Sequence, residues 1–341
     1  HSLYTGKVRA YLRKQGVPYV EKMPSDPVFR DAILPQIGRS IIPVLLCPDG
    51  RVIQDSVDII DHFETQGARL SAWPPGLKQQ LAAHVLELYG SIGMTRHAMH
   101  YRWSFLAEQE RFLLDAFGAG SGSDAAARVM ARMASYLPPL GVTPETAPLI
   151  ERSFEDLLDI LERHFTHHPY LLGAQPSLGD YGLLGPMFAH LGRDPVPAGV
   201  MKRRAPKVYR WVERMNAPDL DMPEYGSHPP GYLADDQLPD TLAPLLRHVA
   251  EELFPEVVDK LAFLQEHVAR ISPADGDPVS AKPHQRTIGL APTSFRGAPV
   301  ESGVQPYLLY LWGRITGAFA AAPLEAQADA RRYFEDVGLA R

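Results

Sequence analysis

Residues 41–63, IIPVLLCPDGRVIQDSVDIIDHF, restrict the fold more than any other stretch of the chain. Pro43 stands at the start of an apolar run. Because proline lacks a backbone N–H, it fits only an edge, a strand start or a special backbone position. Between two strand-like runs stand Pro48, Asp49 and Gly50, three residues that favour a turn. The stretch therefore predicts a β-hairpin.

A helix is expected directly after this hairpin. Ile59, Ile60 and Phe63 recur at helical spacing behind Asp55 and Ser56. A helix start with an acid, a hydroxyl and exposed N–H groups suits a zwitterionic ligand, with its carboxylate on the amides and its ammonium on the acid. The alternative is an ordinary hairpin that runs into a capped helix.

The first residues predict a loop, a helix and a strand. Val8, Tyr11 and Leu12 share one helical face, and Gly16 is a natural helix end. Val17–Glu21 then has the character of a strand.

Together these patterns resemble the glutathione transferase superfamily, in particular bacterial-type members with a long C-terminal extension. The resemblance implies a thioredoxin-like N-terminal domain, a cis Ile42–Pro43 bond and glutathione as co-substrate. The backbone of Ile42 would meet the cysteinyl part of glutathione, and Asp55 and Ser56 would hold its γ-glutamyl end. Asp55 is a variant of that pattern, since Glu or Gln is commoner at this position.

The resemblance also places Ser2 at the catalytic serine, with Thr5 or Tyr4 as alternatives. A free thiol has a pKa near 8.5, and lowering it by about two units takes roughly 2.7 kcal/mol. One charge-assisted hydrogen bond of about 1.5–3 kcal/mol, helped by a helix N-terminus, is enough. The alternative role of Ser2 is to cap the helix.

A second motif lies more than a hundred residues downstream. Ser177 and Asp180 have capping-box spacing, and the apolar residues that follow, among them Leu183 and Leu184, predict a buried helix. This resembles the start of the central helix in the C-terminal domain of the same family. There it serves folding and not catalysis.

We therefore expect an α/β plus all-α fold in three parts. These are a thioredoxin-like glutathione-binding domain (1–68), an all-helical domain (75–222) and a C-terminal helical extension (223–341). The family's first strand would precede the Ser2 loop, so it is missing or very short in a sequence that begins at His1. Within the extension, 287–290 and 293–295 are strand-like, and 308–319 carries a helical apolar stripe.

Composition excludes several classes of protein. A formal charge of −6 over 341 residues argues against a nucleic-acid binder. No apolar run reaches membrane-spanning length and no signal peptide is visible, so we expect no membrane partner. Cys47 is the only cysteine and follows an apolar run, which favours a buried thiol and, weakly, the cytoplasm.

Histidine clusters raise the question of a metal site. His97 and His100 have ligand spacing but no convincing third ligand, and the cluster His164, His167 and His168 lies at a helix end, where histidine interacts well with the helix dipole. We expect no metal. Packing or a pocket-lining face explains the first pair equally well.

The expected function is that of a glutathione transferase, a homodimer that directs the glutathione thiolate at a small apolar electrophile. A catalytically inactive glutathione-binding or protein-interaction module of the same fold is the alternative. A histidine metalloenzyme is a third possibility, and it requires stoichiometric zinc.

Overall fold

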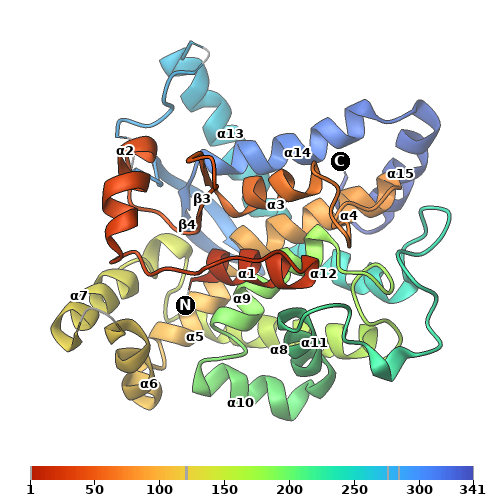
Figure 1. Ribbon diagram of the computed structural model, residues 1–341. Helices are drawn as coiled ribbons and strands as arrows, with labels where there is room; N and C mark the ends of the chain where they lie inside the picture. Colours follow the sequence, from red (N-terminus) through yellow and green to blue (C-terminus); the bar gives the residue numbers. More distant parts are fainter. Residues whose placement is uncertain (1, 120–121, 275, 283–284, 341) are drawn as a thin grey trace.

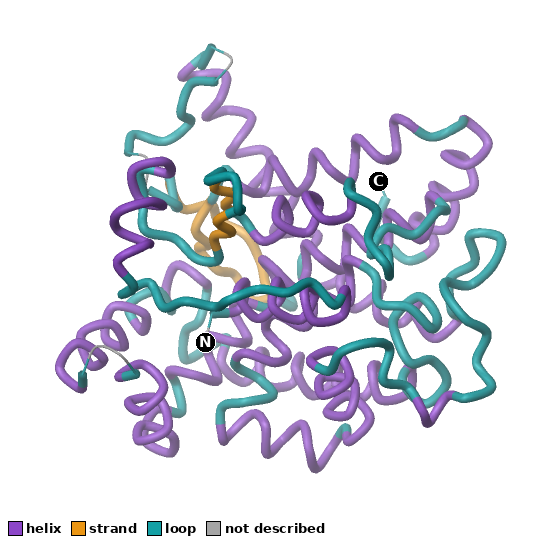
Figure 2. The backbone as a smooth tube through the Cα atoms, in the orientation of Figure 1, coloured by secondary structure: helices purple, strands orange, loops and turns teal. Residues whose placement is uncertain are grey.

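The computed structural model describes residues 2–119, 122–274, 276–282 and 285–340. The chain is mainly helical, with two separate two-stranded sheets among the described residues (Figures 1 and 2). The first third contains α1 (Leu3–Gln15), α2 (Leu34–Ile37), β1 (Val44–Leu46), β2 (Val52–Gln54) and α3 (Ser56–Glu64).

The predicted hairpin and the helix after it are confirmed. β1 pairs antiparallel with β2 in the register Val44↔Gln54. The turn closes with the Gly50 amide donating to the Cys47 carbonyl at 3.0 Å, and Gly50 has φ 86°, a conformation that glycine adopts easily. Cys47 is buried, as expected.

The prediction of a strand at Val17–Glu21 is wrong. These residues form a loop that leads to a π-helical turn (Phe29–Ile33), and Tyr19 and Val20 are exposed. A strand needs a neighbour to accept its ladder of hydrogen bonds, and the structure as described offers no strand beside this segment. The thioredoxin-like part therefore keeps only the second half of its sheet.

The all-helical domain follows the linker at Trp73–Gly76. Its helices are α4 (Leu77–Leu88), α5 (Thr95–Trp103), α6 (Leu106–Gly118), α7 (Ser123–Ala134), α8 (Ala147–His164), α9 (Leu178–Ala189), α10 (Pro195–Arg204) and α11 (Pro206–Asn216). A π-helical turn, Tyr89–Gly93, joins α4 to α5, and a 3-10 turn, Pro138–Leu140, follows α7.

Helix α9 is the centre of the fold. The predicted capping box is confirmed, because the Ser177 side chain accepts from the Asp180 amide while the Asp180 carboxylate accepts from the Ser177 amide. All but one of its residues are buried, and α9 packs against both α1 and α4. The capping box thus fixes the helix on which the first domain rests.

The extension is mainly helical, as predicted, and the strand-like pieces expected at 287–290 and 293–295 fall largely within one strand of a hairpin. It contains α12 (Ala243–Glu252), α13 (Phe254–Ile271), the hairpin β3 (Gly289–Phe295) and β4 (Ala298–Val304), α14 (Tyr307–Ala321) and α15 (Leu324–Asp336). The hairpin contacts α13 and the Pro138–Leu140 turn. Figure 1 shows α14 passing along α3, and α14 and α15 both pack against α4.

Candidate functional site

The hairpin register brings the predicted binding residues to one end of the small sheet. Val44 lies opposite Gln54, so Pro43 and Asp55 continue from the same end of the two strands. The Ile42–Pro43 bond is cis, as predicted. Pro43 is buried, whereas Ile42 is 41% exposed.

The backbone of Ile42 is unused within the described part of the chain. Its N–H and C=O form no hydrogen bond there, because the ladder begins only at Val44. Main-chain groups normally find partners when they are buried, so a free pair at a half-exposed position is available to an incoming ligand. An extended peptide-like ligand has the matching donor and acceptor.

Asp55 caps α3 and has one carboxylate oxygen to spare. Its Oδ1 accepts the Val57 amide at 2.8 Å and the Tyr307 hydroxyl at 3.0 Å. Asp55 adopts φ 77°, a left-handed conformation that turns the chain sharply into the helix. No described residue bonds Oδ2, so this oxygen remains for a cation. Ser56, the next residue, is only 2% exposed.

Three hydroxyls lie at the start of α1. Ser2 is the N-cap of this helix, and its half-buried oxygen accepts the Thr5 amide at 3.5 Å. As an acceptor there, Ser2 keeps its own hydroxyl proton available. The Thr5 hydroxyl is buried and bonds to no described residue. Ser2 is therefore both a cap, as in the alternative interpretation, and a free donor.

Tyr4 is already committed to another bond. Its hydroxyl donates to the Ser91 carbonyl at 3.0 Å. Burial raises the pKa of Tyr4, against a lowering by the charge of Arg286, and the carboxylate of Asp55 adds to the rise. The phenol is thus neutral at pH 7.

A buried ion pair joins α1 to α4. Lys7 Nζ lies 2.6 Å from Glu87 Oε1, with the two side chains 1% and 2% exposed. Ser91 donates to the same oxygen at 2.6 Å. Burial favours the neutral acid, but Lys7 outweighs it and keeps the pKa of Glu87 below its usual value. Helices α1 and α4 are fixed together at the site.

The extension supplies residues that the sequence analysis missed. Tyr310 donates to Asp58, and Arg314 Nη2 lies 2.9 Å from Asp61 Oδ1. With Tyr307 on Asp55, one face of α14 thus follows one face of α3. Burial, with the nearby charges of Glu87 and Asp55, raises the pKa of Tyr307, so it is a donor at neutral pH. The sequence did hold a signal for this contact, because the polar residues of α14 and the acids of α3 each recur every three or four positions.

The histidines point to separate partners. His97 Nε2 lies 2.7 Å from Ser153 Oγ, and His100 Nε2 lies 3.0 Å from Glu151 Oε1. His164 bonds Thr241 and the Tyr170 carbonyl. A search of the described residues finds no group of three or more His, Cys, Asp or Glu side chains placed to hold a metal ion. It also finds no helix that is long and apolar enough to cross a membrane.

Comparison with known proteins defines the class to which this fold and site belong. Residues 1–69 match the family model of the glutathione S-transferase N-terminal domain, and residues 125–214 match that of the C-terminal domain. The chain belongs to the glutathione S-transferase superfamily. It is longer than the two domains together, and no curated protein matches it.

Solved structures give looser matches. A glutathione S-transferase from Xanthobacter autotrophicus Py2 is 22% identical, with 63% of this chain and 89% of that one covered and a TM-score of 0.34. Gtt2 from Saccharomyces cerevisiae is 12% identical, with 63% of this chain and 91% of that one covered and a TM-score of 0.35. A possible glutathione S-transferase from Rhodopseudomonas palustris is 17% identical, with 70% of this chain and 88% of that one covered and a TM-score of 0.34. The family assignment rests on the two domain models and not on these superpositions.

Proposed function

We propose that the protein is a glutathione transferase that binds glutathione at the end of the β1–β2 hairpin and activates its thiol. The observation that carries the proposal is the unused backbone of Ile42 beside the cis Pro43, next to an Asp55 carboxylate with a free oxygen. A peptide with a zwitterionic end fits this combination. The Ile42 N–H and C=O would pair with its backbone, and Asp55 would take its ammonium.

The roles of the other residues follow from the same placement. Ser56 and the N–H groups that open α3 would receive the α-carboxylate, since a helix N-terminus favours negative charge. The Ser2 hydroxyl would donate to the thiolate, helped by the start of α1. Tyr4 is a weaker candidate, because its proton already goes to Ser91.

We further propose that residues 1–68 bind glutathione, residues 75–222 hold the electrophile, and residues 223–341 close the site from outside. Tyr307, which reaches Asp55 from the extension, supports the last assignment. A small apolar electrophile, a cytoplasmic location and a homodimer complete the proposal. Sedimentation equilibrium of the purified chain tests the dimer.

Loss of Asp55 is the test of glutathione binding. A charge-assisted contact to a buried ligand group contributes about 1.5–3 kcal/mol, so Asp55→Ala should weaken glutathione binding roughly ten- to a hundredfold. Calorimetric titration measures this, with circular dichroism as the folding control. Asp58→Ala is the matched variant, because it also removes a partner of the extension but lies one turn inside α3. Equal, small effects of the two variants would mean that Asp55 only caps the helix.

Loss of Ser2 separates activation from binding. Ser2→Ala should raise the pKa of the bound thiol towards the free value, by up to about two units, and leave glutathione affinity nearly unchanged. An ultraviolet titration of the thiolate in the complex is the measurement. An unshifted pKa in the variant would transfer the role to Thr5, whose buried hydroxyl also lacks a partner among the described residues.

The second candidate function is a glutathione-binding module without catalysis. It is favoured by the hydrogen bond from Tyr307 of the extension to Asp55, one of the residues proposed to bind glutathione. Turnover of a generic aromatic electrophile by protein that binds glutathione decides between the two. Binding without turnover favours the module.

A further inference from the structure

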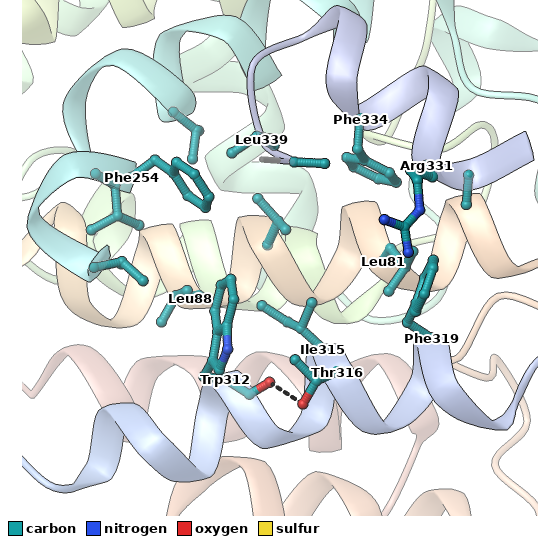
Figure 3. Close-up of a pocket in the computed structure, with 16 residues that line it drawn as sticks. Leu81, Leu88, Phe254, Trp312, Ile315, Thr316, Phe319, Arg331, Phe334 and Leu339 are labelled. Carbon is teal, nitrogen blue, oxygen red and sulfur yellow. Dashed lines mark hydrogen bonds between the residues drawn. The ribbon is translucent and has the colours of Figure 1, made fainter. Parts of the chain in front are cut away.

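The extension and α4 form a half-open apolar cavity that the glutathione site does not use. Its volume is about 250 Å³, and its walls come from α4, α12, α13, α14 and α15 (Figure 3). Apolar surface gathered in a hollow that opens to solvent is characteristic of ligand-binding grooves and interaction sites. An engineered cavity of roughly 150 Å³ with a similar apolar lining stays dry and binds benzene.

Helix α14 separates this cavity from the glutathione site. Its residues Tyr307, Tyr310 and Arg314 bond α3, whereas Trp312, Ile315 and Phe319 line the cavity. The two sets lie on different faces of the same helix. A ligand in the cavity would therefore contact none of the residues proposed for glutathione.

One cation stands at the rim of this otherwise apolar space. The guanidinium of Arg331 lies over the ring of Phe319, 5.4 Å from its centroid, and Figure 3 shows it reaching towards that ring. Arg331 is exposed and forms no ion pair within the described chain. Two acids on α15 are occupied by other cations, since Asp329 pairs with Lys78 and Asp336 with Arg247, and no described ion pair joins Arg331 to the other two, Glu325 and Glu335. Among the described residues, Arg331 is thus a positive charge without an ion-pair partner beside an apolar cavity.

We propose that this cavity binds a single-chain amphipathic anion, such as a medium-chain carboxylate. The chain lies among Leu88, Trp312, Ile315 and Phe334, and the carboxylate meets Arg331 at the rim. The interior has almost no polar group to hold a neutral head, because the Thr316 hydroxyl already donates to the Trp312 carbonyl at 3.2 Å. A cationic head would be repelled by Arg331.

The volume limits the length of the chain. With roughly 30 Å³ of liquid volume for a group the size of a water molecule, the cavity holds about eight such groups. Each methylene that becomes buried raises affinity roughly fourfold. Affinity should therefore increase from butyrate to octanoate by about that factor for each carbon, and then level off for longer acids.

Trp312 provides the signal for a direct test. Octanoate is titrated into the full chain, with tryptophan fluorescence and calorimetry as readouts, in the presence and absence of glutathione. We expect saturable binding of one octanoate per chain that glutathione does not displace. Trp312→Phe should remove the fluorescence change and keep the calorimetric signal. Competition by glutathione would place the ligand in the other site and overturn the proposal.

Three variants test the geometry. Arg331→Gln should weaken octanoate binding about five- to tenfold and leave binding of neutral 1-octanol unchanged. Arg332→Gln, the matched control on the same helix, changes the same charge but pairs with Asp329 and should have no effect. Ile315→Trp fills the cavity and should abolish binding of both compounds.

Two outcomes would overturn the proposal. If octanoate and 1-octanol bind equally and Arg331→Gln changes neither, the cavity has no preference for an anion. If octanoate fails to bind while sedimentation shows that Ile315→Trp dissociates a dimer, the cavity receives a second copy of the chain. The test does not depend on whether the protein activates glutathione.

Discussion

Two of the polar contacts between the extension and the rest of the chain have opposite character. The outer seam, between α14 and α3, consists of Tyr307–Asp55, Tyr310–Asp58 and Arg314–Asp61, and the last two side chains are 18% and 24% exposed. The inner cluster joins the extension to α5 through Arg96, Glu256, Lys260 and Ser302, all 6% exposed or less. The outer seam is thus partly solvated, whereas the inner cluster is buried.

This difference indicates which contact can open. A partly exposed ion pair contributes little, since water replaces the lost partner at small cost. Removing one member of a buried pair leaves an uncompensated charge and is strongly destabilising. The inner cluster therefore holds the extension in place, whereas the outer seam can open at small cost.

The largest effect should come from the inner cluster. Glu256 lies 2.7 Å from Arg96 and 2.5 Å from Lys260, so Glu256→Gln leaves two buried cations without their shared acid. We expect a loss of about 3–5 kcal/mol in the free energy of unfolding. Urea denaturation measures this loss. Glu301→Gln, on the exposed side of β4, is the matched control and should change stability by less than about 0.5 kcal/mol. Equal effects of the two variants would remove the distinction between the inner cluster and the outer seam.

Acid should weaken the inner region first. Burial lowers the pKa of His97 from 6.5 to about 4, so the folded protein keeps this residue neutral. The unfolded chain takes up a proton below pH 6.5, and stability is therefore lost as the pH falls from 6.5 to 4, by about 3 kcal/mol for this group. Thermal unfolding across this range gives the slope, and His97→Gln should reduce it. An unchanged slope would assign the acid sensitivity to other buried histidines, such as His164.

Glu256 extends the loss of folding stability to lower pH. Burial opposes its ionisation, but Arg96 and Lys260 prevail and lower its pKa from 4.5 to about 2. A carboxylate with a lowered folded pKa contributes stability above 4.5 that disappears as the pH falls to 2. The two groups therefore act in the same direction, one after the other.

The smallest effect should come from the outer seam. Tyr307→Phe removes the hydrogen bond that orients Asp55 and leaves the Asp55 Oδ2 atom untouched. A neutral hydrogen bond contributes about 0.5–1.5 kcal/mol, so glutathione affinity should fall roughly two- to tenfold while urea stability changes by about 1 kcal/mol or less. Tyr310→Phe, one turn further from the site, is the control. A gain in affinity for Tyr307→Phe would mean that the extension competes with the ligand.

Local chemistry made the hairpin and the capping box predictable. Proline, the Pro48-Asp49-Gly50 turn and the acid at position 55 each dictate a backbone geometry within a few residues. The failed strand at Val17–Glu21 had the right composition but no neighbouring strand, and pairing depends on the neighbour.

Tertiary contacts of the extension could not be predicted in the same way. The analysis of 308–319 identified the apolar stripe of α14 but not its polar face. Tyr307 and Asp55 are 252 residues apart, and similar polar spacings on two helices do not by themselves show that these helices pair. The cavity likewise depends on how five helices meet, which no single stretch of sequence encodes.

The separation between Asp55 and Tyr307 has a consequence for protein synthesis. Translation at about 5–20 residues per second needs roughly 10–50 s to make the 252 residues between them. During that time the hairpin and α3 are present on the ribosome while their cover has not been made. A nascent chain therefore displays the start of α3 to the cell before the finished protein does, and a message truncated before the codon for Tyr307 would yield a product with that end permanently uncovered.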